Sequence, residues 1–215
     1  MAINGTVAVL GDRARPERDE ITLDGVAVVV RTDLVHYLLN KPRGVVTTAS
    51  DPQGRPTVLE LVPSEPRVFP VGRLDLDTEG LLLITNDGAF ANLIAHPSHG
   101  ISKTYLAEVE GEPSRGALRA IREGVPLEDG PSAPAEASVV ARRDSTSMVE
   151  IVVHEGRNRI VRRIFDALGH PVIRLVRTNI GPLRDPDLAP GRWRPLTTAE
   201  VRALYVAASG TGPHD

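Results

Sequence analysis

The residues most able to do chemistry lie in one short segment, Gly72 to Gly80, which contains three acids. Arg73 stands two residues before Asp75, and Asp77 and Glu79 follow at the same spacing. A carboxylate beside a guanidinium stays ionised and oriented at neutral pH, which suits a nucleophile or a general base. The alternative is a turn with solvated acids, and the segment by itself leaves both readings open.

The same acids imitate the start of a calcium-binding EF-hand loop, but the match fails further on. The twelfth position falls on Asn86 instead of glutamate, and an apolar run fills the second half of the loop. His96 and His99 flank Pro97 at an irregular spacing that favours a surface loop over a metal site. These spacings therefore do not indicate a metal site.

Arginine supplies the second group of candidates. Between residues 157 and 177 there are six arginines and one acid, Asp166, so the local charge is +5 on a chain whose formal net charge is −3. The six are Arg157, Arg159, Arg162, Arg163, Arg174 and Arg177. A focused basic patch on a mildly acidic protein indicates a polyanion bound at one place. The alternatives are an i,i+4 surface pair of Arg162 with Asp166, and an arginine content that reflects a GC-rich genome.

Several function classes lose their usual signals. The chain has no cysteine, which excludes disulfides, a thiol nucleophile and zinc–cysteine sites. It contains no G-x-S-x-G elbow, no P-loop and no dinucleotide fingerprint. Hydrophobic residues make up 41 % and charged residues 25 % of the 215, an ordinary soluble composition. No apolar run approaches the roughly 20 residues that span a bilayer, and the N-terminus does not read as a secretory signal, so we expect a cytoplasmic protein.

The elements that must position these residues follow from periodicity and caps. The expected strands span residues 34–40, 81–84, 101–109, 135–141, 148–154 and 171–178. The expected helices are a short one capped by Asp87, one over 114–123, an amphipathic one over 157–168, and one that opens at a capping box from Thr197 to Glu200.

Strands outnumber helices, and most connections are too short for repeated crossovers. The sequence therefore predicts an α+β fold: a mainly antiparallel, mixed sheet with flanking helices and a catalytic cleft. We expect three parts: residues 1–30, which form short strands and turns and are too small to hold a core; a main domain over 31–208; and a frayed tail over 209–215.

Five segments in this order closely resemble motifs of one family. They are Lys41-Pro42-Arg43-Gly44, Gly72-Arg73-Leu74-Asp75 with Thr78-Glu79-Gly80-Leu81, Lys103-Thr104-Tyr105, Gly156-Arg157-Asn158-Arg159-Ile160-Val161-Arg162-Arg163, and Arg177-Thr178-Asn179-Ile180-Gly181-Pro182-Leu183. The family is the RsuA/RluB-type bacterial ribosomal RNA pseudouridine synthases. The resemblance covers residues 34–205.

The resemblance implies the pseudouridine synthase fold and a uridine isomerase that uses no cofactor and no metal. The uracil is detached from its sugar, turned, and rejoined through carbon. The resemblance makes Asp75 the catalytic acid, Tyr105 the ring that stacks on the target base, and Arg162 the partner of Asp75. It also implies that Leu175 lines the pocket, although a plain core role fits Leu175 equally. The residues expected to contact RNA are Lys41, Arg43, Arg73, Lys103, Arg157, Arg159, Arg163 and Arg177.

The resemblance also bears on the target RNA and on the N-terminal residues. Residues 51–58 are most similar to the large-subunit branch, which implies a uridine of 23S ribosomal RNA or of a pre-ribosomal particle. Residues 1–30 look like only the second half of the alpha-L RNA-binding motif that usually begins such chains. Two alternatives are an RNA-binding or ribosome-assembly protein that lost turnover, and a glycosidase built on Asp75 and Asp77. We expect a monomer with no membrane partner.

Overall fold

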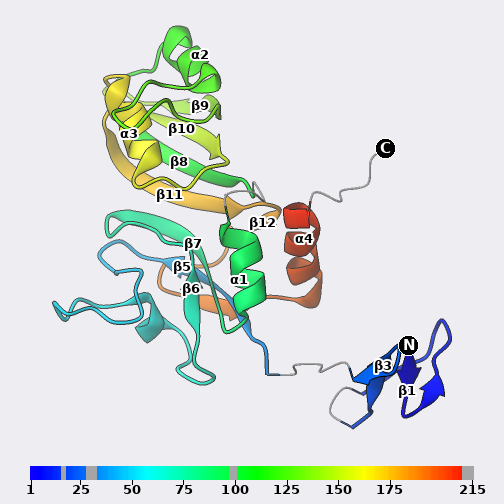
Figure 1. Cartoon of the computed structure of the whole chain (residues 1–215). Helices are drawn as coiled ribbons and strands as arrows, with labels where there is room; N and C mark the ends of the chain where they lie inside the picture. The colour runs from blue at the N-terminus through cyan, green and yellow to red at the C-terminus, as the bar shows by residue number, and fades with distance from the viewer. Residues whose placement is uncertain (16–17, 28–32, 97–100, 210–215) are drawn as a thin grey trace. The chain divides into compact units, whose positions relative to one another are not determined.

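The computed structural model of this chain describes residues 1–15, 18–27, 33–96 and 101–209 (Figure 1). Its contacts divide the chain into two units, Met1–Leu34 and Val35–Asp215, which are described separately. The domain boundary predicted between residues 30 and 31 lies outside the described residues. All but the first residue of the predicted tail over 209–215 lies outside them as well.

The first unit is a small antiparallel sheet in the order β2-β1-β3-β4. Its strands are β1 (Ala2–Ile3), β2 (Thr6–Val7), β3 (Ile21–Leu23) and β4 (Val26–Ala27). Two hairpins turn through the two-residue loops Asn4-Gly5 and Asp24-Gly25, and all four loop residues have positive φ. Positive φ at both positions is the type I′ turn, whose twist matches that of the strands.

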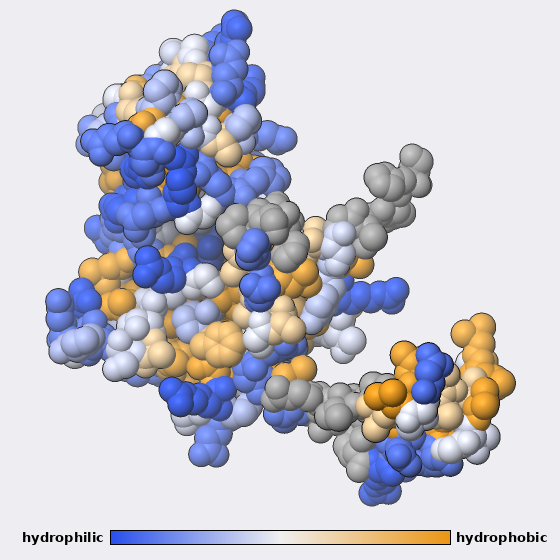
Figure 2. Space-filling view, viewed as in Figure 1, coloured by the Kyte–Doolittle hydropathy of each residue, from blue (hydrophilic) through white to orange (hydrophobic). Residues whose placement is uncertain are grey.

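Apolar side chains of this unit are exposed, and Figure 2 shows several of them on its visible face. Val7, Leu10 and Val26 are each more than two-thirds exposed. No member of the buried hydrophobic clusters comes from the described part of Met1–Leu34. The residues that the structure describes here thus form hairpins without a buried core.

The second unit is built on a nine-stranded sheet in the order β13-β5-β7-β11-β8-β10-β9, with β6 paired to β7 and β12 to β11. Its strands are β5 (His36–Lys41), β6 (Phe69–Val71), β7 (Thr78–Thr85), β8 (Lys103–Glu110), β9 (Glu136–Arg142), β10 (Thr146–Val153), β11 (Val172–Ile180), β12 (Leu183–Arg184) and β13 (Trp193–Pro195). Among the described strands only β7 and β11 pair in parallel. The predicted α+β class with a mainly antiparallel sheet is confirmed.

The parallel pair joins segments nearly one hundred residues apart and sets the register of the centre. Thr78 lies opposite Leu175, and Gly80 lies opposite Arg177. On its other edge β11 places Arg177 opposite Tyr105 of β8. The start of β7, which forms the end of the acidic segment Gly72–Gly80, therefore lies beside β11 and close to β8.

Helices cover this sheet at its two ends (Figure 1). They are the 3-10 helix η1 (Val58–Leu61) and the α-helices α1 (Gly88–Ala95), α2 (Arg115–Glu123), α3 (Ile160–Ala167) and α4 (Thr198–Ser209). The cap predicted at Asp87 is confirmed, because its Oδ1 accepts from the Phe90 N–H at 3.0 Å. Ser114 caps α2 in the same way through the Ala117 N–H.

The arginine-rich helix is shorter than its apolar pattern predicts. It begins at Ile160 instead of residue 157, because Arg159 has left-handed backbone dihedrals, with φ 50° and ψ 30°. A left-handed residue cannot be part of a right-handed helix. Arg157 and Arg159 consequently lie on the loop before α3, and only Arg162 and Arg163 lie on the helix itself.

The core consists of three clusters that meet near the centre of the sheet. One packs Ile164 and Phe165 of α3 on the α2–β10 side. A second joins Phe90 of α1 to Leu204 of α4, and a third contains Leu74 beside the acidic segment. Packing thus holds α3 against the α2–β10 part of the sheet and α1 against α4.

The capping box predicted at the start of α4 is confirmed, and its Glu200 carboxylate is also part of an ion pair. The Thr197 N–H donates to Glu200, and the Glu200 N–H donates to the Thr197 hydroxyl. Arg194 donates to both Glu200 oxygens, at 2.9 and 2.7 Å. This hydrogen-bonded pair lowers the pKa of Glu200 to about 2.

We expect Glu200→Gln to lower the free energy of unfolding by about 1–2 kcal/mol at neutral pH. A carboxyl whose pKa is depressed on folding contributes stability above its unfolded pKa and loses it as the pH falls through the folded pKa. The difference between parent and variant should therefore shrink as the pH falls from about 4.5 towards about 2. Urea unfolding across this range measures it, and a gap that does not narrow at low pH would contradict the assignment.

Candidate active site

A cavity of about 300 Å³ opens at the junction of the three core clusters. Its walls come from four parts of the chain: residues 71–78, β8, the loop 155–161 with the start of α3, and β11. Ile94 and Ala95 at the end of α1 add an apolar border. Its size is at the lower limit for pockets that hold small ligands.

Within the acidic segment Gly72–Gly80, residues 75–78 form a turn at the cavity wall, called the acidic turn below. Hydrogen bonds to backbone carbonyls of the segment hold this turn in place. The Thr78 N–H donates to the Asp75 carbonyl at 3.1 Å, and the Gly44 N–H donates to the Leu76 carbonyl at 2.8 Å. Thr47 donates its hydroxyl to the carbonyl of Leu74, whose side chain is buried. This backbone support leaves the Asp75 side chain 29 % exposed, on the cavity wall.

Two arginines meet the acids of this turn. Arg159 Nη1 lies 3.6 Å from Asp75 Oδ2, and the same guanidinium donates to both oxygens of Asp77 at 3.0 and 3.1 Å. Arg162 Nη2 lies 3.3 Å from Asp77 Oδ2 and donates to the Asp77 carbonyl at 3.0 Å. Burial opposes ionisation of Asp77, but these arginines outweigh it and hold the pKa of the carboxyl below its usual value.

The predicted contact of Arg162 with Asp75 is therefore replaced by a different pairing. Asp75 has Arg159 as its ion-pair partner, whereas Arg162 binds Asp77 and donates to the Val172 carbonyl at 3.0 Å. The surface pair of Arg162 with Asp166 is also wrong, because Arg162 is only 6 % exposed. Arg162 lies on the buried face of helix α3, and its guanidinium contacts the acidic turn from the protein interior.

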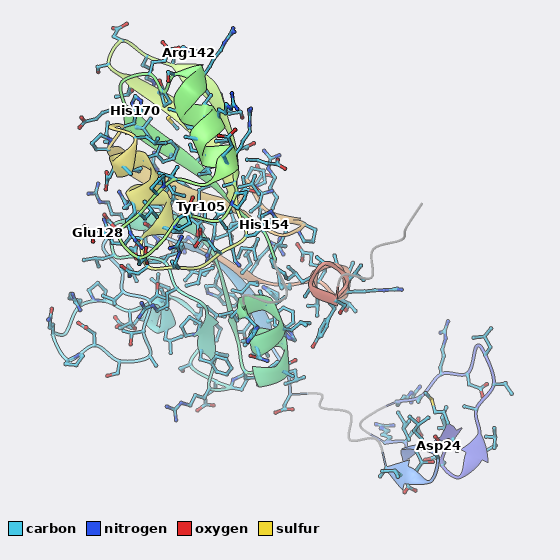
Figure 3. The ribbon with its side chains drawn as sticks, turned by 45° about the horizontal axis from the view of Figure 1, so that its top comes forward. Asp24, Tyr105, Glu128, Arg142, His154 and His170 are labelled. Carbon is cyan, nitrogen blue, oxygen red and sulfur yellow. The ribbon has the colours of Figure 1, made fainter. Side chains whose placement is uncertain are left out.

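Tyr105 and Leu175 line the cavity from neighbouring strands. Tyr105 of β8 is half-buried and lies near the centre of the unit, as Figure 3 shows. Leu175 of β11 is 4 % exposed and also belongs to the core cluster around α3. Both readings of Leu175 thus hold together. An aromatic ring and an aliphatic side chain accompany Asp75 on the wall.

Lysine 41 does not occupy the surface position expected for an RNA contact. Its side chain is fully buried, and its ammonium donates to the Thr78 and Pro42 carbonyls at 2.8 and 3.0 Å. Burial lowers the pKa of Lys41 to about 8, while the charges of Asp75 and Asp77 oppose the shift. Because β5 pairs with β7, the lysine lies beneath the acidic turn and supports it from inside the protein.

Two further cations, Lys103 and Arg177, line the cavity from its strand side. Arg177 is 5 % exposed and donates through Nε to the Leu81 carbonyl at 2.7 Å. Burial, together with the charge of Arg177, holds the pKa of Lys103 below its usual value. Any contact of Arg177 with RNA would have to be made from within the cavity.

The predicted basic patch is largely neutralised by acids from elsewhere in the chain. Asp129 accepts from both Arg157 and Arg163, and Arg157 also pairs with Glu155. Arg174 donates to both oxygens of Glu79, at 2.9 Å each. The local charge of +5 counted along the sequence is thus not the charge that the folded surface presents.

Arg43, in the loop after β5, and Arg73, just before the acidic turn, remain as exposed cations. No carboxylate among the described residues lies within 4 Å of either guanidinium. Arg73 lines the cavity. Among the residues predicted to contact RNA, these two side chains are the most available for an anionic ligand.

Sequence reasoning missed the part that Asp77 plays, because it treated this acid as solvated or as a second glycosidase acid. The D-x-D spacing was the one available signal, since alternate residues of a turn can face the same way. No sequence signal marks Asp129, whose partners lie 28 and 34 residues away. In the part of the chain that the structure describes, no group of three or more metal-ligating side chains comes together, and no helix is long and apolar enough to cross a membrane.

The family model and two relatives that match this chain are all RNA pseudouridine synthases. Residues 35–167 match the family model of RNA pseudouridylate synthases. The chain is 47 % identical over 203 residues to an uncharacterised RNA pseudouridine synthase of Mycobacterium leprae, covering 93 % of this chain and 79 % of that protein. It is 45 % identical over 193 residues to the ribosomal large subunit pseudouridine synthase B of Bacillus subtilis, covering 88 % and 79 %.

A solved structure gives the same answer for the fold. The crystal structure of a pseudouridylate synthase superposes with a TM-score of 0.74 at 32 % identity, covering 94 % of this chain and 87 % of that one. The cavity and its acidic turn therefore lie within a fold shared with that enzyme.

Proposed function

Because the chain belongs to the RNA pseudouridylate synthase family, we propose that it converts one uridine of large-subunit ribosomal RNA to pseudouridine. Family membership makes the chain a pseudouridine synthase, an isomerase, and does not favour a binding protein without turnover. The choice of the large-subunit RNA rests on the names of relatives from Bacillus subtilis and Pseudomonas aeruginosa. We place the reaction in the cytoplasm, with the protein acting as a monomer.

The observation that carries the proposal is the Asp75 carboxylate on the cavity wall, 3.6 Å from Arg159 and on the same wall as Tyr105. The reaction breaks the bond between the sugar and the uracil nitrogen and forms one to a uracil carbon. It is balanced without oxidant or reductant. An ionised carboxylate can serve it by attacking the sugar, attacking the ring or taking a sugar proton.

The target nucleotide must leave its helix to reach this carboxylate. A base inside a duplex cannot enter a cavity, so the uridine is flipped out or taken from a loop at a cost of a few kcal/mol, which is least for unpaired RNA. Tyr105 would then stack on the uracil and Leu175 would pack against it. Arg159 keeps a positive charge 3.6 Å from the Asp75 carboxylate during the reaction.

Phosphates on either side of the target require cations at the mouth of the cavity. Arg73 and Arg43 are exposed and suit this role, with Lys103 and Arg177 deeper inside. Arg157 and Arg163 can join them if phosphates displace Asp129. The first unit, with its two hairpins, is proposed to contribute to RNA binding.

The test is to map pseudouridine by carbodiimide-dependent primer stops on unmodified ribosomal RNA. The RNA is incubated with the chain or with its Asp75→Asn form. A stop that only the parent creates on 23S RNA supports the proposal and names the nucleotide. A stop on 16S RNA would overturn the choice of subunit, and no stop on either RNA would contradict the proposed substrate.

Arg73→Ala should weaken binding of this RNA about three- to tenfold and reduce the slope of log affinity against log salt by roughly 0.7–0.9. The reason is the loss of one phosphate contact and of the counterions that it releases. The matched control is Arg119→Ala, because Arg119 already pairs with Glu123 on α2. Filter binding from low to moderate salt measures both, and an equal slope for parent and Arg73→Ala would exclude the contact.

A further inference from the structure

Asp77 is the acid with the most arginine contacts in the candidate site. It receives two hydrogen bonds from Arg159 through its carboxylate, lies 3.3 Å from Arg162, and gives its carbonyl to the same Arg162. Asp75, two residues earlier, has only the 3.6 Å contact with Arg159. Neither carboxylate oxygen of Asp75 accepts a hydrogen bond from a described residue.

Because the arginines bind mainly Asp77, the oxygens of the Asp75 carboxylate remain accessible to a substrate. A bidentate pair with arginine occupies both oxygens of a carboxylate and fixes the guanidinium in its plane. Asp77 is held in that way, and Arg159 is thereby kept beside Asp75 without closing over it. Asp75 retains its electron pairs for the substrate, with the Arg159 guanidinium 3.6 Å away.

The two arginines come from neighbouring positions around the start of α3. Arg159 is the left-handed residue before the helix, and Arg162 follows one turn later. Arg162 is also held by the carbonyls of Val172 and Asp77. In the absence of the Asp77 carboxylate, Arg162 keeps these two carbonyls, whereas Asp75 is the remaining carboxylate within 4 Å of Arg159 among the described residues.

We propose that Asp77 is a positioning residue of this site, which holds Arg159 and Arg162 in a shared ion-pair network so that the Asp75 carboxylate stays unblocked. The proposal rests on the assigned role of Asp75 as the catalytic acid. It assigns to Asp77 no contact with the RNA.

The experiment measures single-turnover rates at saturating enzyme, with RNA affinity measured separately. Asp77→Ala should slow the reaction about 30- to 100-fold, because Arg159 moves onto Asp75, while the dissociation constant changes less than about threefold. Asp77→Asn should stay within about fivefold of the parent, because its amide oxygen still accepts from Arg159. Rescue by asparagine separates hydrogen-bonded positioning from a need for the second negative charge.

A double variant tests the cause directly. Asp77→Ala with Arg159→Ala removes the side chain expected to cover Asp75, so at saturation it should be faster than Asp77→Ala alone. Glu112→Ala is the matched control, since it removes an acid from an arginine pair at Arg142, which lies at the end of the unit away from Tyr105 (Figure 3). Melting temperatures of all variants exclude rate losses caused by unfolding.

The outcomes distinguish this proposal from the proposed function. Activity of the parent, lost in Asp75→Asn, establishes the reaction whatever Asp77 does. Asp77→Ala within about threefold of the parent would overturn the positioning role. So would an asparagine variant as slow as the alanine variant, or a double variant slower than Asp77→Ala.

Discussion

Asp75→Asn should lower the rate of pseudouridine formation at least about a thousandfold and leave RNA affinity within about threefold of the parent. Asparagine has nearly the shape of aspartate, and its amide oxygen can take the place of the carboxylate oxygen that lies 3.6 Å from Arg159. The amide nitrogen, however, holds no electron pair that could attack a sugar or ring or take a proton at neutral pH. The substitution therefore removes the chemistry and preserves the contacts.

The fold should tolerate this change, because the Asp75 side chain is partly exposed and the turn is held by backbone hydrogen bonds. A single-turnover assay on the mapped RNA gives the rate, and a melting curve gives the stability. Asp187→Asn, in the loop before β13, is the control for an acid outside the cavity lining. Appreciable turnover by Asp75→Asn would show that another residue is the catalytic acid.

Gly80→Ala should destabilise the protein by roughly 3 kcal/mol or more, which lowers the melting temperature on the order of 10 °C. Gly80 has φ +108°, and an added Cβ would lie 2.2 Å from the Arg177 carbonyl oxygen and 2.6 Å from its nitrogen. Both atoms are backbone, so no side chain can rotate away. Relief requires the parallel pair of β7 and β11 to separate.

That pair joins the two halves of the sheet, so activity should fall along with stability. Its register holds Thr78 beside Leu175, and the acidic turn begins three residues before Thr78. Gly116→Ala is the matched control, because it lies within α2 with Ser114 Oγ at an ordinary 3.6 Å from the added Cβ. We expect it to be neutral or more stable by about 0.5–1 kcal/mol. Equal melting temperatures for Gly80→Ala and the parent would contradict the close approach.

Much of the fold is encoded locally and could be predicted. Asp87, Ser114 and the box from Thr197 to Glu200 are local signals for helix starts, because their side chains satisfy free N–H groups at a helix end. The sequence pattern located the six predicted strands of the main domain to within about three residues at either end, whereas the short strands β6, β12 and β13 were not predicted. The largest error in a helix boundary, at α3, came from Arg159, whose left-handed backbone no propensity indicates.

The sequence by itself determined which side chains this protein can use: one acidic turn, one aromatic residue after a lysine and a threonine, and a run of arginines in the order of a known family. Only the tertiary structure decided which of them meet. Arg159 pairs with Asp77, which is 82 residues away in the sequence, and Arg174 pairs with Glu79, which is 95 residues away. The pairing of β5 with β7 places the buried Lys41 next to the acidic turn. Periodicity records which face of an element is buried, whereas the strength of a charge pair depends on distance and burial in the folded chain, and no local pattern carries that information.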